Sequence, residues 1–490
     1  MSVVFLLLLP LIATALVCIP FNKYWAPGVT VVSSVGILIL AARIALVASA
    51  GSSVTATLKV GALKWIAVDG LSALILLLIA FVGTTAAIFS VGYMAHDSLP
   101  PSRLRLYYAN YNLFIFSMLA VPVMAEPTLV WIVVELTTLC SALLVSFENT
   151  REALEAAWKY VVLSLMGAGM ALFGFLILFA AMQAAGGGTY TWDGLVRAAP
   201  RMPPALLQTA FLLILIGLGT KAGLVPMHTW LPDAHSQAPS PVCALLSGVE
   251  TTVILYVILR LFPIMKGAPN AHAETWALVF GLTSVGVAAF LLLQVSDYKR
   301  MFAFSTVEHM GIILTAIGLG TSVSGFGAMQ QIVAHSVTKS FCFFAAGAAL
   351  LAVGTREIAA VRGLIHRSPA AGAALILGGL SIAGAPPLAI FLSEFSILRA
   401  GLTQKHYLAT GLLALFIVIA FFGVMLHINR MVFGADDQSE AEPEHVAKFH
   451  LPFSCNLALI LAAVPVLLLG VYVPKPLNDL LAQAAAVLTR

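Results

Sequence analysis

Three long apolar stretches of the sequence each contain a side chain that can gain or lose a proton. Glu135 lies in LVWIVVELTTLCSALLVSF, Lys159 in EALEAAWKYVVLSLMGAGM, and Lys221 directly after AFLLILIGLGT. A charged side chain at the middle of a bilayer costs at least about 2.5–3.5 kcal/mol, so such residues are candidates for an ion or proton path. Two plainer interpretations stay open: Glu135 could end its helix, and Lys159, near the start of its span, could reach the membrane surface.

A fourth stretch, QQIVAHSVTKSFCFF, carries polar residues at a regular spacing. Gln331, His335 and Lys339 follow one another at intervals of four residues. This spacing places them on one face of a helix, over about 12 Å. A histidine and a lysine this close together in an apolar span are poised to titrate near neutral pH. The alternative is a hydrogen-bonded packing stripe between helices.

Lys221 and Glu394 both lie beside residues that break helices. Gly223 and Pro226 follow Lys221, and the string GAPP ends seven residues before Glu394. Proline cannot donate to the helical ladder, and a broken helix is tolerated in a membrane only where it is buried in protein or lines a wet cavity. Transporters place half-helix ends at ion sites in this way. We therefore predict two discontinuous spans with a charge beside each break.

The first break also contains His228, Asp233 and His235, within the string PMHTWLPDAHSQAPSP. Their spacing matches no common metal-binding motif. We expect these residues to cap and shape the loop, and we expect no metal site.

Charged residues recur in a similar order in two halves of the chain. The two series are Glu135, Lys159 and Lys221, then Glu308, Lys339 and Glu394. Two halves that each contain one broken span indicate a repeat transporter.

Membrane-spanning helices must position these residues. Of the 490 residues, 61% are hydrophobic and 9% are charged, whereas soluble domains carry about 25% charged residues. The apolar runs are continuous and not alternating, which argues against a β-barrel. We predict an all-α polytopic membrane protein with about fourteen spans of about 20 residues each, at residues 2–20, 29–49, 71–93, 110–124, 127–147, 155–183, 206–225, 240–262, 274–295, 302–320, 325–352, 371–398, 407–431 and 452–473.

Several features limit the chemistry of the chain itself. The first basic residue is Lys23, so residues 2–20 are expected to be a retained span and not a cleaved signal peptide. The five cysteines are scattered without a CxxC motif, and there is no glycine-rich nucleotide loop. We therefore expect no cofactor, no redox or ATP chemistry and no nucleic-acid partner. Lysine and arginine are more frequent in the odd-numbered loops, which favours both termini outside.

Several longer strings resemble one family. GTKAGLVPMHTWLPDAHSQAPSPVCALLSG, DYKRMFAFSTVEHMG, HSVTKSF and PPLAIFLSEF resemble the antiporter-like membrane subunits of respiratory complex I, of membrane-bound hydrogenases and of multisubunit sodium/proton antiporters. ELTTLCSALLVSF, ALEAAWKY, SVGYMAH, VGTREI and FLSEF are most similar to component F of hydrogenase-4 and formate-hydrogenlyase-type complexes. The resemblance covers about residues 60–430.

The resemblance implies fourteen transmembrane helices with two inverted five-helix repeats and with broken seventh and twelfth helices. The implied parts of the chain are residues 1–109 with helices 1–3, residues 110–262 with helices 4–8, residues 263–431 with helices 9–13, and residues 432–490 with a linker and the last helix.

The resemblance also implies a proton channel along a central axis of glutamate, lysine and histidine. By motif position, the implied relay residues are Glu135, Lys159, Lys221, Lys299, His335, Lys339 and Glu394. Secondary candidates are Glu250, Glu308, His228, His235 and Gln331. Glu135 and Lys221 are expected to pair across the first half-channel. At about 10 Å and an effective dielectric constant near 20, their attraction is about 1.7 kcal/mol.

The sequence departs from the family pattern in three places. Gln331 stands where the HxxxHxxxK motif has its first histidine, and Thr252 stands where several members have a lysine, with Glu250 as an added carboxylate. We expect the proton path to be interrupted, rerouted or bridged by water at these points. The given sequence stops at Arg490, so we do not expect the long lateral helix of the most distal complex I subunit, which disfavours that subunit.

These observations predict a proton-translocating subunit of a redox-driven complex in the inner (plasma) membrane, of the hydrogenase-4, formate-hydrogenlyase or NADH-dehydrogenase type. Expected partners are lipid, other membrane subunits and a peripheral redox arm with iron–sulfur subunits, joined by NiFe subunits in a hydrogenase. The alternatives are a component of a multisubunit sodium/proton antiporter, a component of an inorganic-carbon uptake system, and a structural anchor with an inactive channel.

Overall fold

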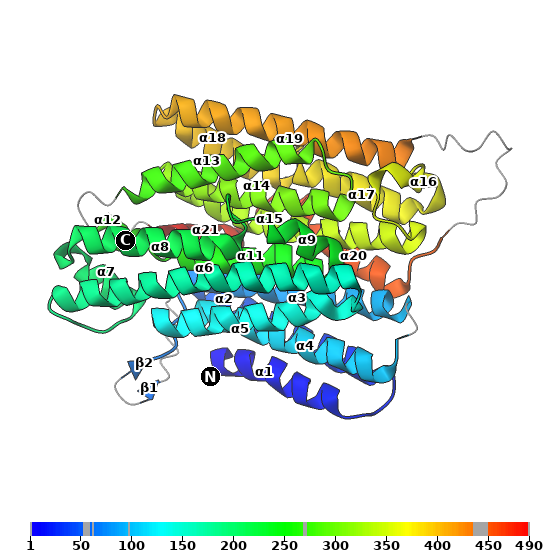
Figure 1. Cartoon of the computed structure of the whole chain (residues 1–490), viewed down its shortest axis with the longest axis horizontal. Helices are drawn as coiled ribbons and strands as arrows, with labels where there is room; N and C mark the ends of the chain where they lie inside the picture. Colours follow the sequence, from blue (N-terminus) through cyan, green and yellow to red (C-terminus); the bar gives the residue numbers. More distant parts are fainter. Residues whose placement is uncertain are drawn as a thin grey trace.

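The computed structural model describes residues 2–51, 59–60, 63–96, 99–267, 272–434 and 449–488. Long helices run side by side along most of the molecule (Figure 1). The expected linker near 432–450 falls largely on residues 435–448, which lie outside the described residues. The prediction of an all-α membrane protein is confirmed, apart from one small hairpin in which strand β1 (Lys59–Val60) pairs antiparallel with β2 (Leu63–Lys64).

Within the described residues, eleven helical segments are long and apolar enough to cross a membrane. They are α2 (Trp25–Ser49), α3 (Gly70–His96), α4 (Pro101–Ala120) with η1 (Val121–Val123), α5 (Pro127–Val145) with η2 (Ser146–Glu148), α6 (Arg151–Ala184), α8 (Pro204–Ala222), the segment Ser240–Lys266, α13 (Ala273–Leu292), α14 (Tyr298–Gly318), α15 (Ser322–Val353) and α19 (Tyr407–Phe433).

Three shorter apolar helices fall on other predicted spans: α1 (Ser2–Cys18), α17 (Pro369–Ile382) and α20 (Phe453–Leu468). The exact number of fourteen spans stays a prediction. The remaining elements are α7 (Trp192–Ala198), η3 (Ala199–Arg201), α9 (Trp230–Gln237), α10 (Ser240–Leu245), η4 (Leu246–Glu250), α11 (Thr251–Leu259), α12 (Phe262–Lys266), η5 (Ile358–Ala360), α16 (Leu364–Arg367), α18 (Ala389–Thr403) and α21 (Lys475–Val487).

Both predicted breaks are present. Helix α8 stops at Ala222, and Gly223 adopts φ +81°, a left-handed conformation that glycine allows at little cost. Helix α17 stops at Ile382, and Gly384 has φ +74°. The peptide bonds Val225–Pro226 and Pro386–Pro387 are cis. The chain resumes helical structure in α9 and in α18, so each break leaves helix ends inside the bundle.

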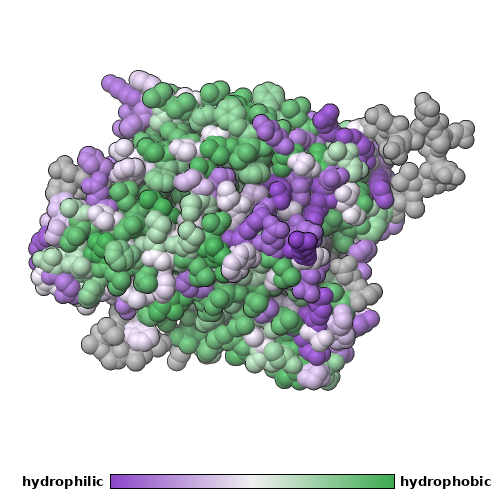
Figure 2. All heavy atoms as spheres, viewed as in Figure 1, coloured by the Kyte–Doolittle hydropathy of each residue, from purple (hydrophilic) through white to green (hydrophobic). Residues whose placement is uncertain are grey.

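The core of the bundle is formed by helices that carry the ionisable residues. In the most apolar 18-residue window of Ser240–Lys266, every residue is buried. The share of buried residues in the corresponding window is 94% for α14 and 28% for α19, which lies at the periphery. Close helix contacts rest on small residues. For example, a Cβ on Gly217 of α8 would clash with the carbonyl oxygen of Gly167 in α6. Figure 2 shows that apolar side chains cover much of the face in view, with hydrophilic side chains gathered around the position of α9.

Candidate functional site: a buried line of ionisable side chains

Lys221 occupies the end of α8, directly before the first break. Its side chain is buried, and its Nζ donates to the carbonyl oxygen of Val134 (2.9 Å) and to Oγ1 of Thr137 (2.6 Å) and Thr138 (2.5 Å), all on α5. The same Nζ lies 3.4 Å from Oε1 of Glu250. One lysine thus ties the broken span to two neighbouring spans.

Glu250 ends η4, a π-helical turn between α10 and α11. Its Oε1 also accepts from the hydroxyl of Tyr160 (3.1 Å) and from Ser141 Oγ (3.4 Å), whereas its Oε2 is buried without a partner among the described residues. Insertions of this kind into α-helices are frequent at functional sites. This short segment faces α8 through Glu250 and α15 through the carbonyl oxygen of Ser247.

The carboxylate in ion-pair contact with Lys221 is Glu250, one of the secondary candidates. The expected attraction between Lys221 and Glu135, at about 10 Å across the half-channel, stays a prediction. Glu135 follows Val134 on α5, and its Oε1 is buried without a hydrogen-bond partner among the described residues. The pairing depends on how α5 and η4 rotate toward α8, which the order of residues along the chain does not reveal.

Lys159 lies apart from this cluster. Its side chain is 47% exposed, and its Nζ pairs with Oε1 of Glu155 (2.8 Å) and with Oδ2 of Asp233 (3.1 Å). This position corresponds to the surface-reaching lysine that the sequence had left open as an alternative.

A second cluster surrounds Lys339 on α15. Its Nζ donates to the carbonyl oxygen of Phe302 and to Ser305 Oγ on α14, both at 2.5 Å. Glu308 follows Ser305 by one turn of α14 and is also buried. Gln331, His335 and Lys339 are all fully buried on α15, as expected for one face directed into the bundle.

A chain of contacts joins α15 to the second break. Nε2 of His335 lies 3.1 Å from the carbonyl oxygen of Ser247 in η4, and its ring centroid lies 5.3 Å from that of His309. Nδ1 of His309 lies 2.7 Å from Nε2 of Gln331, and Oε1 of Gln331 accepts from Ser393 Oγ on α18. The glutamine that replaces a family histidine is therefore in hydrogen-bond contact with another histidine.

Sequence reasoning missed His309, although it directly follows Glu308 in STVEHMG. A histidine inside an apolar stretch is the signal that would have marked it. Ser141 gave no such signal, since serine hydroxyls in helices commonly bond to their own backbone, and Tyr160 gave none because its side chain is neutral.

Glu394 follows Ser393 and is buried against the second break. A Cβ on Gly384 would clash with Oε2 of Glu394. Glycine is therefore required there both for the left-handed backbone and for the close approach of the carboxylate.

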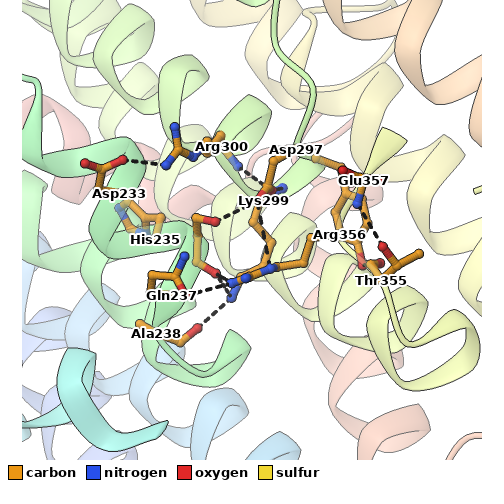
Figure 3. A network of polar contacts seen from close by, with 12 residues as sticks. Asp233, His235, Gln237, Ala238, Asp297, Lys299, Arg300, Thr355, Arg356 and Glu357 are labelled. Carbon is orange, nitrogen blue, oxygen red and sulfur yellow. Dashed lines mark hydrogen bonds and ion pairs between the residues drawn. The ribbon is translucent and has the colours of Figure 1, made fainter. Parts of the chain in front are cut away.

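Lys299 belongs to a network that holds the end of α9 against the start of α14 (Figure 3). Its Nζ donates to the carbonyl oxygens of Ser236 (3.2 Å) and Ala238 (2.6 Å). Asp297 caps α14 and accepts from Ser236 Oγ at 2.6 Å. Arg300 pairs with Asp233 at 2.6 Å. Lys299 thus satisfies carbonyl groups at a helix end, and within the described residues no hydrogen bond or ion pair joins its side chain to another of the relay residues.

The two histidines of the first break have different surroundings. His235 is fully buried, stacks on Phe343 with 5.0 Å between ring centroids, and has two ring nitrogens without a hydrogen-bond partner among the described residues. His228 is 9% exposed, and its Nδ1 also lacks a partner there. In the described part of the chain, no group of three or more His, Cys, Asp or Glu residues could hold a metal ion.

The fold and the site define a helical membrane protein with two broken spans and buried lysine, glutamate and histidine residues. The family model described as "NADH:quinone oxidoreductase/Mrp antiporter, TM" matches residues 126–422, and the model of the N-terminus of complex I chain 5 matches residues 65–101. The chain belongs to this family of antiporter-like membrane subunits.

Two relatives and one solved structure illustrate the likeness. The chain is 37% identical to a hydrogenase-4 component F homolog from Methylacidiphilum infernorum, over 83% of this chain and 85% of that protein. It is 31% identical to a Na(+)/H(+) antiporter subunit from Alkalihalophilus pseudofirmus, over 67% of this chain and 41% of that protein. The fold matches a chain of the membrane-bound sulfane sulfur reductase, an archaeal respiratory membrane complex, with TM-score 0.87, 22% identity and coverage of 99% and 97%.

Proposed function

We propose that the chain is the proton-translocating membrane subunit of a redox-driven complex of the hydrogenase-4, formate-hydrogenlyase or NADH-dehydrogenase type. The observation that carries this proposal is the series of buried polar contacts between the two breaks. It begins with Lys221 and Glu250 beside the first break. Ser247 lies on the same turn η4 as Glu250, and its carbonyl oxygen lies 3.1 Å from Nε2 of His335, whose ring lies beside that of His309. Gln331 then joins His309 to Ser393, the residue before the buried Glu394.

The Lys221–Glu250 pair is the element of this path that can exist in two states. At 3.4 Å and an effective dielectric constant of about 20, the attraction is about 5 kcal/mol, and at about 10 Å it falls below 2 kcal/mol. The closed pair holds the proton on Lys221, and an opened pair frees it to move along the path. Val134, which accepts from Lys221, precedes Glu135, so a charge change at Glu135 would act directly on this pair.

The matching breaks support the two inverted repeats that the family resemblance implies, and the eleven long and three shorter apolar helices of the described residues support its fourteen spans. In each break a left-handed glycine lies three residues before a proline, Gly223 before Pro226 and Gly384 before Pro387. The driving reaction would come from partner subunits, in our proposal other membrane subunits and a peripheral iron–sulfur arm. We further propose the inner membrane as the location, with both termini outside.

The second candidate is a component of a multisubunit sodium/proton antiporter. The 31% identity to the Alkalihalophilus pseudofirmus antiporter protein favours it. The 37% identity to a hydrogenase-4 component F homolog, over most of both chains, favours the redox-driven complex. Hydrogenase or dehydrogenase genes beside this one would support the first candidate, and a cluster of small antiporter genes would support the second.

The test is proton uptake driven by the redox reaction of the complex in sealed membrane vesicles. Lys221→Ala should abolish the proton gradient while redox turnover persists, and the exposed-residue control Lys475→Ala should leave both unchanged. A gradient that survives Lys221→Ala would contradict the relay and favour a structural anchor. A gradient that collapses only when sodium is withdrawn would favour the antiporter.

A further inference from the structure

Helices α1 and α2 enclose an apolar groove of about 570 Å³ that the proton path does not use. Leu9, Ala13 and Leu16 line it from α1, and Gly28, Val29 and Val32 line it from α2. Pockets of this size with mostly apolar walls and a few polar groups at one end are typical of small-ligand sites.

Two hydrogen bonds between the helices define the ends of the groove. Nε1 of Trp25 donates to the carbonyl oxygen of Leu16 at 2.9 Å, and Ser33 Oγ donates to that of Leu9 at 3.3 Å. Leu9 and Leu16 are seven residues apart, which is roughly 10 Å along a helix. Between these two bonds, a Cβ on Gly28 would meet nothing within 4 Å. The helices are thus held together at two points, and small side chains leave the space between them open.

The groove opens on an exposed apolar surface, as expected for a face toward lipid. Helix α1 lies at the edge of the bundle (Figure 1). Exposed apolar side chains flank the groove on both helices, among them Ile12 (52% exposed) and Val32 (74% exposed). A groove bounded by bonds roughly 10 Å apart admits an extended hydrocarbon chain, whereas a helix with its side chains is about 10–12 Å across.

The mouth of the groove has the residues of a membrane interface. Asn22, Tyr24 and Trp25 line it, and aromatic residues of this kind gather at the headgroup level of bilayers. Lys23 lies among them and is the only charged residue before Arg43. The first acidic residue of the chain is Asp69. Nζ of Lys23 lies over the ring of Tyr24, 5.1 Å from its centroid, so a positive charge stands at the mouth and fits a negatively charged headgroup.

We propose that this groove binds one anionic phospholipid, with an acyl chain between α1 and α2 and the phosphate beside Lys23. The lipid would fill the space that Gly28 leaves open and would fix α1 to the rest of the bundle.

The test uses Trp25, one of seven tryptophans, as the reporter. The complex, purified through this chain, is placed in phosphatidylcholine vesicles with increasing amounts of phosphatidylglycerol whose acyl chains carry bromine, which quenches tryptophan emission on contact. The signal of Trp25 is the difference in tryptophan emission between the wild-type complex and the Trp25→Phe variant. If the lipid binds in the groove, quenching of this signal should rise at a low mole fraction of brominated phosphatidylglycerol and then saturate. Brominated phosphatidylcholine should give no such saturating quenching.

Two variants sharpen the test. Gly28→Phe should fill the groove and remove the saturating component, whereas Gly411→Phe should keep it, since a Cβ on Gly411 in α19 also meets nothing within 4 Å. Lys23→Gln should raise the half-saturating mole fraction about fivefold, the factor expected for one lysine near an anionic surface. Quenching proportional to the mole fraction would show ordinary bilayer contact and overturn the proposal. Absence of quenching in the complex would mean that another protein chain covers the groove, and would also overturn it.

Discussion

Lys221 and Glu250 form a buried ion pair, with 3.4 Å between Nζ and Oε1 and with both side chains at most 3% exposed. The lysine is the penultimate residue of α8 and the glutamate ends η4, so the pair connects the broken span to the most deeply buried one. A buried charge that loses its partner is costly, and a buried pair that is removed as a whole is often not. Because of this asymmetry, the coupling between the two residues can be tested by measuring the stability of variants as well as their proton transport.

We expect Lys221→Met to lower the free energy of unfolding by about 3–5 kcal/mol, because Glu250 is left buried and unpaired. The double variant Lys221→Met, Glu250→Gln should recover most of that loss, while proton transport stays abolished. Thermal unfolding in detergent measures the first effect and the vesicle assay the second. A double variant no more stable than the single one would show that the two residues are not coupled.

Gln331→Leu should destabilise the protein by about 1–3 kcal/mol, since it removes the amide that contacts His309 and Ser393. Proton transport should fall with it, because the contact between α14 and α18 is lost. The neighbouring variant Gln330→Leu is the control: Oε1 of Gln330 is buried without a hydrogen-bond partner among the described residues, so its replacement should be neutral or stabilising. Equal effects of the two variants would exclude a specific role for Gln331.

The loss of stability caused by Lys299→Met should be larger than the loss caused by Arg300→Met. Lys299 is 2% exposed and donates to two carbonyl groups, so its loss should cost about 1.5–3 kcal/mol. The Arg300 side chain is 43% exposed in its pair with Asp233, and such pairs contribute about 0–1 kcal/mol. Thermal unfolding of the two variants, measured side by side, compares the two losses. A larger loss of stability for Arg300→Met would contradict the larger structural role that we give to Lys299.

Gly384→Ala should lower stability by about 1–2 kcal/mol for the left-handed backbone alone. The new Cβ would also displace Glu394, whose Oε2 occupies the adjoining space, so transport should fall as well. Gly411→Ala is the matched control and should be neutral or stabilising by up to about 1 kcal/mol, since it lies inside a helix with open space around it. Wild-type stability and transport in Gly384→Ala would refute the role of this break.

Much of the architecture was predictable because hydrophobicity and helix breakers act locally. The spans follow from runs of apolar residues, and both breaks follow from glycine and proline, which have the same backbone limits in any context. The common face of Gln331, His335 and Lys339 follows from the helical period alone.

The partners of the buried charges were not predictable in this way. Lys221 is in ion-pair contact with Glu250, the amide of Gln331 contacts His309, and Lys159 points to the surface. Each outcome depends on the rotation of a helix about its axis and on its neighbours, which only the packed bundle decides. The sequence by itself determined where charges enter the membrane and where helices break. The tertiary structure decided which charges meet, because an ion pair needs two side chains within about 4 Å, and residues far apart in the chain reach that distance only when the helices pack.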